Sequence, residues 1–227
     1  MKNRVKNGLR ISLALLFIAV GLVSAPVGAV PIKLSDLIAN QGSITVGDKL
    51  FSDFTFSLSG QAPYTPSGAS GINVDGIVIG GNNGLRFSGG MHAGPGGDVD
   101  LLIGYTVTVL DPNYWISGIV LRFNGSVTAD GFTNVTETVS NGVNIVGQAT
   151  VVNAPPVLDQ TIYLNTPFLT TVDVVKDIYL SGGQNGTATI SFIDQAVIQT
   201  RVPEPTTLVL LGLGLLAFGA SRRGGRA

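Results

Sequence analysis

The side chains that could do chemistry are few and scattered. The sequence has one histidine, His92, in the glycine-rich stretch SGGMHAGPGGD, and no cysteine. A serine-type triad needs a histidine oriented by a carboxylate, and a thiolate metal site or thiol nucleophile needs cysteine. A lone histidine among glycines is predicted to be a solvated loop residue, and no serine lies in a G-x-S-x-G sequence. The sequence therefore predicts no catalytic site and no cofactor.

Carboxylates are more numerous, and two of them are spaced to share a ligand. Asp98 and Asp100 follow a glycine loop in GPGGDVD, and residues two apart at the start of a strand project to the same side. Calcium takes such oxygen ligands, but a full calcium loop has more of them at regular spacing. Turn chemistry and a polar strand edge are the favoured explanation of the two residues, so no metal is assigned and Asp98 and Asp100 stay a weak calcium candidate. Glu137, in FTNVTETVS, is predicted to lie on a solvated strand face.

One aromatic pair could form a binding surface. Tyr114 and Trp115 are adjacent in LDPNYWISG, and aromatic ring faces can stack on the faces of pyranose sugars. This interpretation would make exopolysaccharide a partner. The alternative, which the sequence alone favours, is a hydrophobic plug at the start of a strand.

The segments that would position these side chains alternate between apolar and polar residues. In DLLIGYTVTVL the apolar side chains at 101, 103, 105, 107 and 109 share one face, and similar runs recur between turn formers such as GGNNG, LDPNY and SGGQNG. About ten short strands of this kind predict an all-β domain over residues 30–201, an antiparallel β-sandwich with a jelly-roll-like arrangement. A short helix is predicted in LSDLIANQG, capped by Ser35 and stopped at Gly42.

Charge argues against nucleic acid as a partner. Between Val30 and Arg201 there are six basic and thirteen acidic residues, a formal net charge of −7. Phosphate contacts need clustered lysine and arginine.

The N-terminus has the layout of an export signal. Four basic residues in positions 1–10 precede the apolar run ISLALLFIAVGLV and the small residues SAPVGAV. This order predicts a signal peptide over residues 1–29, cleaved after Ala29. The predicted partners are the Sec translocon and signal peptidase.

The C-terminus has the layout of a second targeting signal. Residues 206–220 are apolar and are predicted to form a short transmembrane helix, and Arg222, Arg223 and Arg226 follow it. Arginines stay cytoplasmic by the positive-inside rule, which places Pro203, Glu204 and Pro205 at the outer boundary of the membrane. Two prolines keep this tripeptide extended and accessible to a membrane enzyme.

The Pro-Glu-Pro motif, the apolar segment and the arginine tail follow one another in VPEPTTLVLLGLGLLAFGASRRGGRA, residues 202–227. Together they resemble the PEP-CTERM sorting signal of bacterial exported proteins. The resemblance implies that exosortase, an integral membrane enzyme, recognises Pro203–Pro205 and removes the tail. It also implies an inner-membrane intermediate before delivery to the cell surface or beyond. The sequence thus predicts an exported surface or extracellular-matrix protein without catalytic activity. The alternatives left open are a carbohydrate-binding or adhesive module for exopolysaccharide and a secreted hydrolase.

Overall fold

The computed structural model describes residues 30–153, 155–202, 210, 211, 213 and 215. The predicted signal peptide, the Pro203–Pro205 motif and the arginine tail lie outside the described residues. Within the described part of the chain, no helix is long and apolar enough to cross a membrane.

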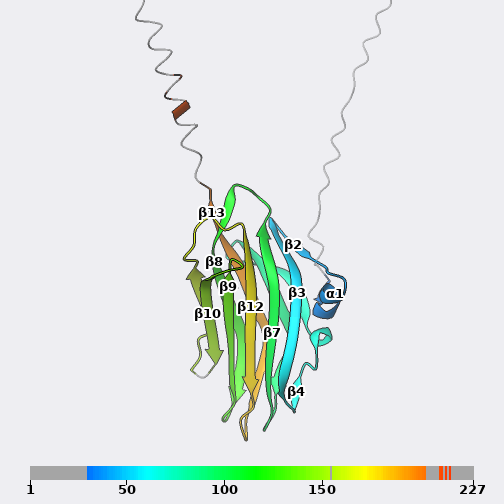
Figure 1. Ribbon diagram of the computed structural model, residues 1–227. Helices are drawn as coiled ribbons and strands as arrows, with labels where there is room; N and C mark the ends of the chain where they lie inside the picture. The colour runs from blue at the N-terminus through cyan, green and yellow to red at the C-terminus, as the bar shows by residue number, and fades with distance from the viewer. Residues whose placement is uncertain (1–29, 154, 203–209, 212, 214, 216–227) are drawn as a thin grey trace, which may run out of the picture.

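The described residues form two antiparallel sheets that pack face to face (Figure 1). The seven-stranded sheet has the order β1-β5-β6-β13-β8-β11, with β4 paired to β6. Its strands are β1 (Ile32–Lys33), β4 (Tyr64–Thr65), β5 (Asn73–Ile79), β6 (Asn82–Ala93), β8 (Tyr114–Thr128), β11 (Asp159–Tyr163) and β13 (Thr187–Arg201). The six-stranded sheet has the order β10-β9-β12-β7-β3-β2. Its strands are β2 (Ile44–Val46), β3 (Lys49–Gln61), β7 (Asp98–Val109), β9 (Phe132–Ser140), β10 (Ile145–Asn153) and β12 (Thr171–Ser181). The predicted all-β sandwich is confirmed.

Period-two alternation builds the core between the sheets. The five residues of β7 predicted to share a face (Leu101, Ile103, Tyr105, Val107 and Val109) are all buried. They meet inward-facing side chains of the other sheet, such as Leu85 and Phe87 of β6. Burying one side of each strand gives the two sheets a common apolar layer, which is the main stabilising term of such a fold.

The strands are longer than predicted because they continue through bulges. β3 shifts register between Ser52 and Thr55, and Asp53 there has a φ of 56°. A bulge adds one residue and restores the inward phase, so Phe51 and Phe54 are both buried although they are three residues apart. Strict alternation read from sequence breaks at such a point, and one long strand then looks like two short ones.

Three local predictions were wrong. The helix α1 (Leu34–Ala39) contains Ser35 in its first turn, and its N-cap position is Lys33 without a side-chain cap. It ends at Ala39 with Asn40 as its C-cap, before Gly42. His92 lies in strand β6 rather than in a solvated loop, half-buried, with Nδ1 3.2 Å from Thr189 Oγ1. Glu137 points into the core and is fully buried, not solvated.

A row of alternating charges crosses the outer face of the seven-stranded sheet. The register aligns Asp75 with Arg86, Arg86 with Asp194, Asp194 with Arg122, and Arg122 with Asp159. At its centre Arg86 donates two hydrogen bonds to Asp194, of 2.7 and 2.8 Å. Opposite charges therefore face each other from β5 to β11, five strands that are dispersed in the sequence.

Candidate functional site

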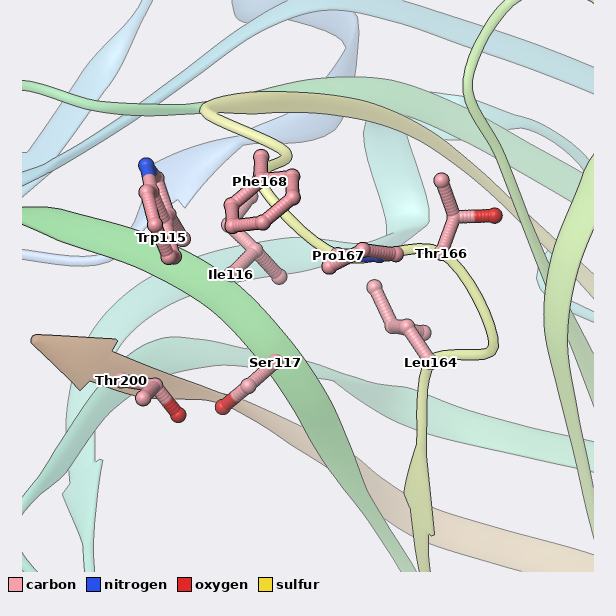
Figure 2. Close-up of a pocket in the computed structure, with 8 residues that line it drawn as sticks. All are labelled: Trp115, Ile116, Ser117, Leu164, Thr166, Pro167, Phe168 and Thr200. Atoms are coloured by element: carbon pink, nitrogen blue, oxygen red, sulfur yellow. The ribbon is translucent and has the colours of Figure 1, made fainter. Parts of the chain in front are cut away.

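A cavity of about 280 Å³ opens at the end of the sandwich where β8 begins and β13 ends (Figure 2). It is lined by Trp115, Ile116, Ser117, Leu164, Thr166, Pro167, Phe168 and Thr200. This volume is at the small end of the range for ligand pockets. The cavity is called the Trp115 pocket below.

Strand β8 supplies one wall because a bulge interrupts its pairing with β13. Gly118 pairs with Ile198 and Ile116 with Gln199, which leaves Ser117 as the extra residue. Ile116 points into the core and is 1% exposed, so the neighbouring Trp115 projects to the opposite side. The strand start thus presents the indole outward.

The loop from Leu164 to Leu169 supplies the other wall, and β8 fixes both of its ends. Leu164 N–H donates to the carbonyl of Ser117 at 2.9 Å, and Ile116 N–H donates to the carbonyl of Leu169 at 2.7 Å. Phe168 has a φ of 69°, a left-handed conformation that is uncommon for a bulky residue. These contacts hold the loop in place, so the pocket is formed without a ligand.

Trp115 and Phe168 make the aromatic part of the pocket. Their ring centroids are 4.3 Å apart at an interplanar angle of 81°, an edge-to-face contact. Phe168 is 63% exposed, and Figure 2 shows the two rings side by side above Ser117 and Thr200. The pair offers an exposed ring surface in a fixed orientation.

The polar lining consists of hydroxyl groups, from Ser117, Thr166 and Thr200. None of the eight lining residues has a titratable side chain, so the pocket has neither a general acid nor a general base of its own. Aromatic surface with uncharged hydroxyls suits binding of a neutral, hydroxyl-bearing ring. It does not suit a phosphate or a carboxylate, which need cationic or backbone donors.

The structure separates the two aromatic residues that the sequence placed together. Trp115 lines the pocket, whereas Tyr114 is half-buried against the core. Adjacent strand residues face opposite sides, which explains the separation. Phe168 takes the place expected for Tyr114, and nothing in the sequence connects a residue so distant along the chain with Trp115.

Asp98 and Asp100 do lie on one side of β7, the outer face of the six-stranded sheet. Asp98 Oδ1 accepts a hydrogen bond from Gln61 N–H at 3.1 Å. Burial and the nearby Asp177 carboxylate raise the pKa of Asp100. Among the described residues, no group of three or more histidines and carboxylates could hold a metal ion.

The core also contains a buried polar cluster that was not predicted from the sequence. Glu137 and Lys176 are both fully buried and form an ion pair, and Gln195 is buried beside them. A signal for them existed, because Glu137 is in phase with the apolar residues Val135 and Val139 of its strand. A charged residue at an inward position marks a core site with a partner.

Comparison with known protein families identifies the C-terminal sorting signal. The PEP-CTERM protein-sorting motif matches residues 201–223, so the chain carries this signal. The motif implies exosortase processing, export through the membrane and a surface or extracellular location. A search of curated proteins found no match.

Two solved structures are similar to the sandwich. One is the enzymatically active domain of bacteriophage CBA120 tailspike protein 4, with 12% identity and a TM-score of 0.32, covering 64% of this chain and 19% of that one. The other is TmCBM61, solved in complex with β-1,4-galactotriose, with 11% identity and a TM-score of 0.33, covering 65% of this chain and 88% of that one. The chain thus spans 19% of the length of the tailspike domain, and at these TM-scores neither similarity bears on function.

Proposed function

We propose that this chain is an exported, non-enzymatic β-sandwich protein that exosortase delivers to the cell surface or extracellular matrix. The observation that carries the proposal is the position of the sorting motif. It begins at Arg201, the last residue of β13, and Val202 N–H still donates to the carbonyl of Asn113 at 2.7 Å. Removal of residues 203–227 would therefore remove none of the described strands.

The proposed order of events follows from the N-terminal signal peptide and the C-terminal sorting signal. The Sec translocon exports the chain, signal peptidase cuts after Ala29, and residues 206–220 hold the protein in the inner membrane. Exosortase then reads Pro203, Glu204 and Pro205 and removes the tail, with Arg222, Arg223 and Arg226 fixing its orientation. The released product is the sandwich.

Deletion of residues 203–227 tests this function. Cells that produce the full chain or the deletion variant are fractionated into membrane, surface and medium, and each fraction is probed for the sandwich. The full chain is expected at the surface or in the matrix, and the deletion variant is expected to be lost from that fraction. Trp115→Ala in the full-length chain serves as the control and should be sorted normally. Unchanged surface delivery of the deletion variant would contradict the proposal.

A second proposed function is glycan binding at the Trp115 pocket. It is supported by the exposed, fixed ring pair and the hydroxyl lining, and a matrix location would supply exopolysaccharide as ligand. A glycan array probed with the exported protein tests it. Trp115→Ala should weaken binding by roughly 10- to 100-fold, since covering one large apolar side chain is worth about 1.5–3 kcal/mol.

The matched control for the glycan test is Tyr163→Ala. Tyr163 is 74% exposed at the end of β11 and is not among the residues that line the Trp115 pocket. Its loss should leave glycan binding unchanged. Equal effects of both substitutions, or an array without signal, would leave the purely structural role in the matrix as the proposal. An activity screen on polysaccharides tests the remaining alternative, a secreted hydrolase.

A further inference from the structure

The core of the sandwich contains three polar side chains on neighbouring strands. Glu137 of β9 and Lys176 of β12 are directly opposite in the register of the six-stranded sheet. Gln195 of β13 faces them from the other sheet. Each of the three residues is 0% exposed. A lysine and a glutamate are almost never fully buried unless they are paired, so their contacts need an explanation.

The contacts bring the amine against the carboxyl group. Lys176 Nζ contacts Glu137 Oε2, and Gln195 Nε2 donates a hydrogen bond of 2.9 Å to Glu137 Oε1. Aromatic rings enclose the amine, with Nζ 5.9 Å from the Phe87 ring centroid and 6.0 Å from that of Tyr105. Each carboxyl oxygen thus has a different partner, and both partners are fully buried.

Burial also acts on the protonation of the pair. It raises the pKa of Glu137 and lowers the pKa of Lys176, although each charge favours the other. Both shifts are toward the neutral acid and the neutral amine, the protonation states that amide formation needs. In water, ionisation of both groups opposes amide formation, because the ammonium has no lone pair and the carboxylate is a poor electrophile. Complete burial of both side chains weakens this obstacle, and desolvation is a known way to activate a lysine nucleophile.

We propose that Lys176 and Glu137 join in an intramolecular isopeptide bond. The Nζ lone pair attacks Cδ of the protonated Glu137 carboxyl group, and negative charge develops on Oε1. The Gln195 amide N–H stabilises this charge, as an oxyanion-hole donor does. The C–Oε2 bond then breaks, and the hydroxyl leaves as water after taking one proton from Nζ. An amide and one water replace one acid and one amine, without an oxidant or a co-reactant.

The register makes the reaction intramolecular and repeatable. The ladder between β9 and β12 runs from Ser140 paired with Asp173 to Phe132 paired with Ser181, so the two side chains cannot drift apart without breaking the sheet. Fixed contact of this kind replaces the loss of translational freedom that a reaction between free molecules requires. The product would tie together two neighbouring strands of the six-stranded sheet through their side chains.

Peptide mapping of the full chain under denaturing conditions tests the proposal. Lys176 is the only trypsin site between Arg122 and Arg201. A free lysine gives the peptides 123–176 and 177–201. The isopeptide bond blocks this cut, so the expected product is a single peptide, 123–201, lighter than its sequence mass by one water, about 18 Da.

A second digestion locates the bond in the unmodified sequence. Cleavage before aspartates releases residues 130–158 and 173–176 as separate peptides. If the bond exists, these two fragments are recovered as one branched species, and fragmentation places the link between Glu137 and Lys176. A branched species that has lost ammonia instead of water, linked at Gln195, would overturn the assignment. Recovery of the two free peptides would overturn the bond itself.

Lys176→Arg is the matched control. It keeps the positive charge and the trypsin site, but a guanidinium does not condense with a carboxyl group under these conditions. The variant should yield peptides 123–176 and 177–201 at full sequence mass. If it does not fold, the two digestions of the unmodified chain still decide between the bond and a simple ion pair.

Discussion

Replacing the buried pair by apolar residues, Lys176→Met with Glu137→Leu, distinguishes a covalent bond from an ion pair by stability. Replacing a buried ion pair by hydrophobic residues of similar size is often neutral or stabilising. An isopeptide bond instead closes a loop of about 40 residues, from 137 to 176, and opening such a loop costs about 4 kcal/mol by the chain-entropy relation used for disulfides. The double variant is therefore expected to be less stable than the unmodified protein, despite its fully apolar core.

The size of the effect is measurable. For a domain of this length, a change of 1 kcal/mol moves the melting temperature by about 2–4 °C, so the expected decrease is on the order of 10 °C. Thermal unfolding followed by circular dichroism measures it. A double variant that melts at or above the temperature of the unmodified protein would refute the covalent bond.

The single variant Lys176→Met is a necessary companion but does not discriminate. It leaves Glu137 buried without its partner, which by itself costs about 3–5 kcal/mol, so a loss of stability is expected with or without the bond. A melting temperature within a degree of the unmodified protein would mean that the pair is not buried at all. The single variant thus tests whether Lys176 and Glu137 are in buried contact, and the double variant tests whether they are covalently joined.

Further predictions concern the sheets. The raised pKa of Asp100 means that the folded state binds its proton more tightly than the unfolded chain does, so this group lowers stability as pH rises above the ordinary value of 3.8. Asp100→Asn should accordingly raise the free energy of unfolding by roughly 0.2–1 kcal/mol at pH 7, with no gain below that pKa, in urea titrations at several pH values; a gain that grows toward acid pH would contradict the assignment. Gly84→Ala would place a Cβ 1.8 Å from the carbonyl oxygen of Gln195, and forcing β6 from β13 should cost more than about 2 kcal/mol. Gly68→Ala, where a Cβ meets nothing within 4 Å, is its control, and equal melting temperatures for the two variants would refute the clash. Arg86→Lys removes the two-pronged contact with Asp194 and should cost about 1 kcal/mol in the same titrations, an effect that is absent if the pair is only superficial.

Strand β7 shows most clearly what could be predicted from the sequence. The alternation from Leu101 to Val109 predicted both the strand and its buried face, because the period of a strand is fixed by the backbone. The same rule held for Glu137, which is in phase with Val135 and Val139, and for Lys176, which is in phase with Val174 and Ile178. The prediction for Glu137 was wrong because it followed the polar, threonine-rich character of FTNVTETVS instead of the phase of residue 137. Two opposite charges, each in phase with apolar neighbours, are the pattern that identifies such a pair.

The Trp115 pocket was beyond the sequence for a different reason. It depends on the bulge at Ser117 and on the loop that carries Phe168, and both are set by pairing between distant segments. His92 was misplaced because glycines on both sides suggested a loop, whereas β6 runs through them. Non-local pairing decides such cases, and alternation along one segment cannot report it.

The charge row on the seven-stranded sheet has a consequence for how the strands find their partners. A slip by one residue is penalised because it turns apolar side chains outward, but a slip by two residues keeps every core residue inside. Side chains on the outer face can also oppose the second error. Moving β13 by two positions would remove Asp194 from between Arg86 and Arg122, its register neighbours on either side, and leave two arginines without the carboxylate that separates them. The charges of the row thus favour one register, because all of them face opposite charges only when the five strands have the observed order and offset.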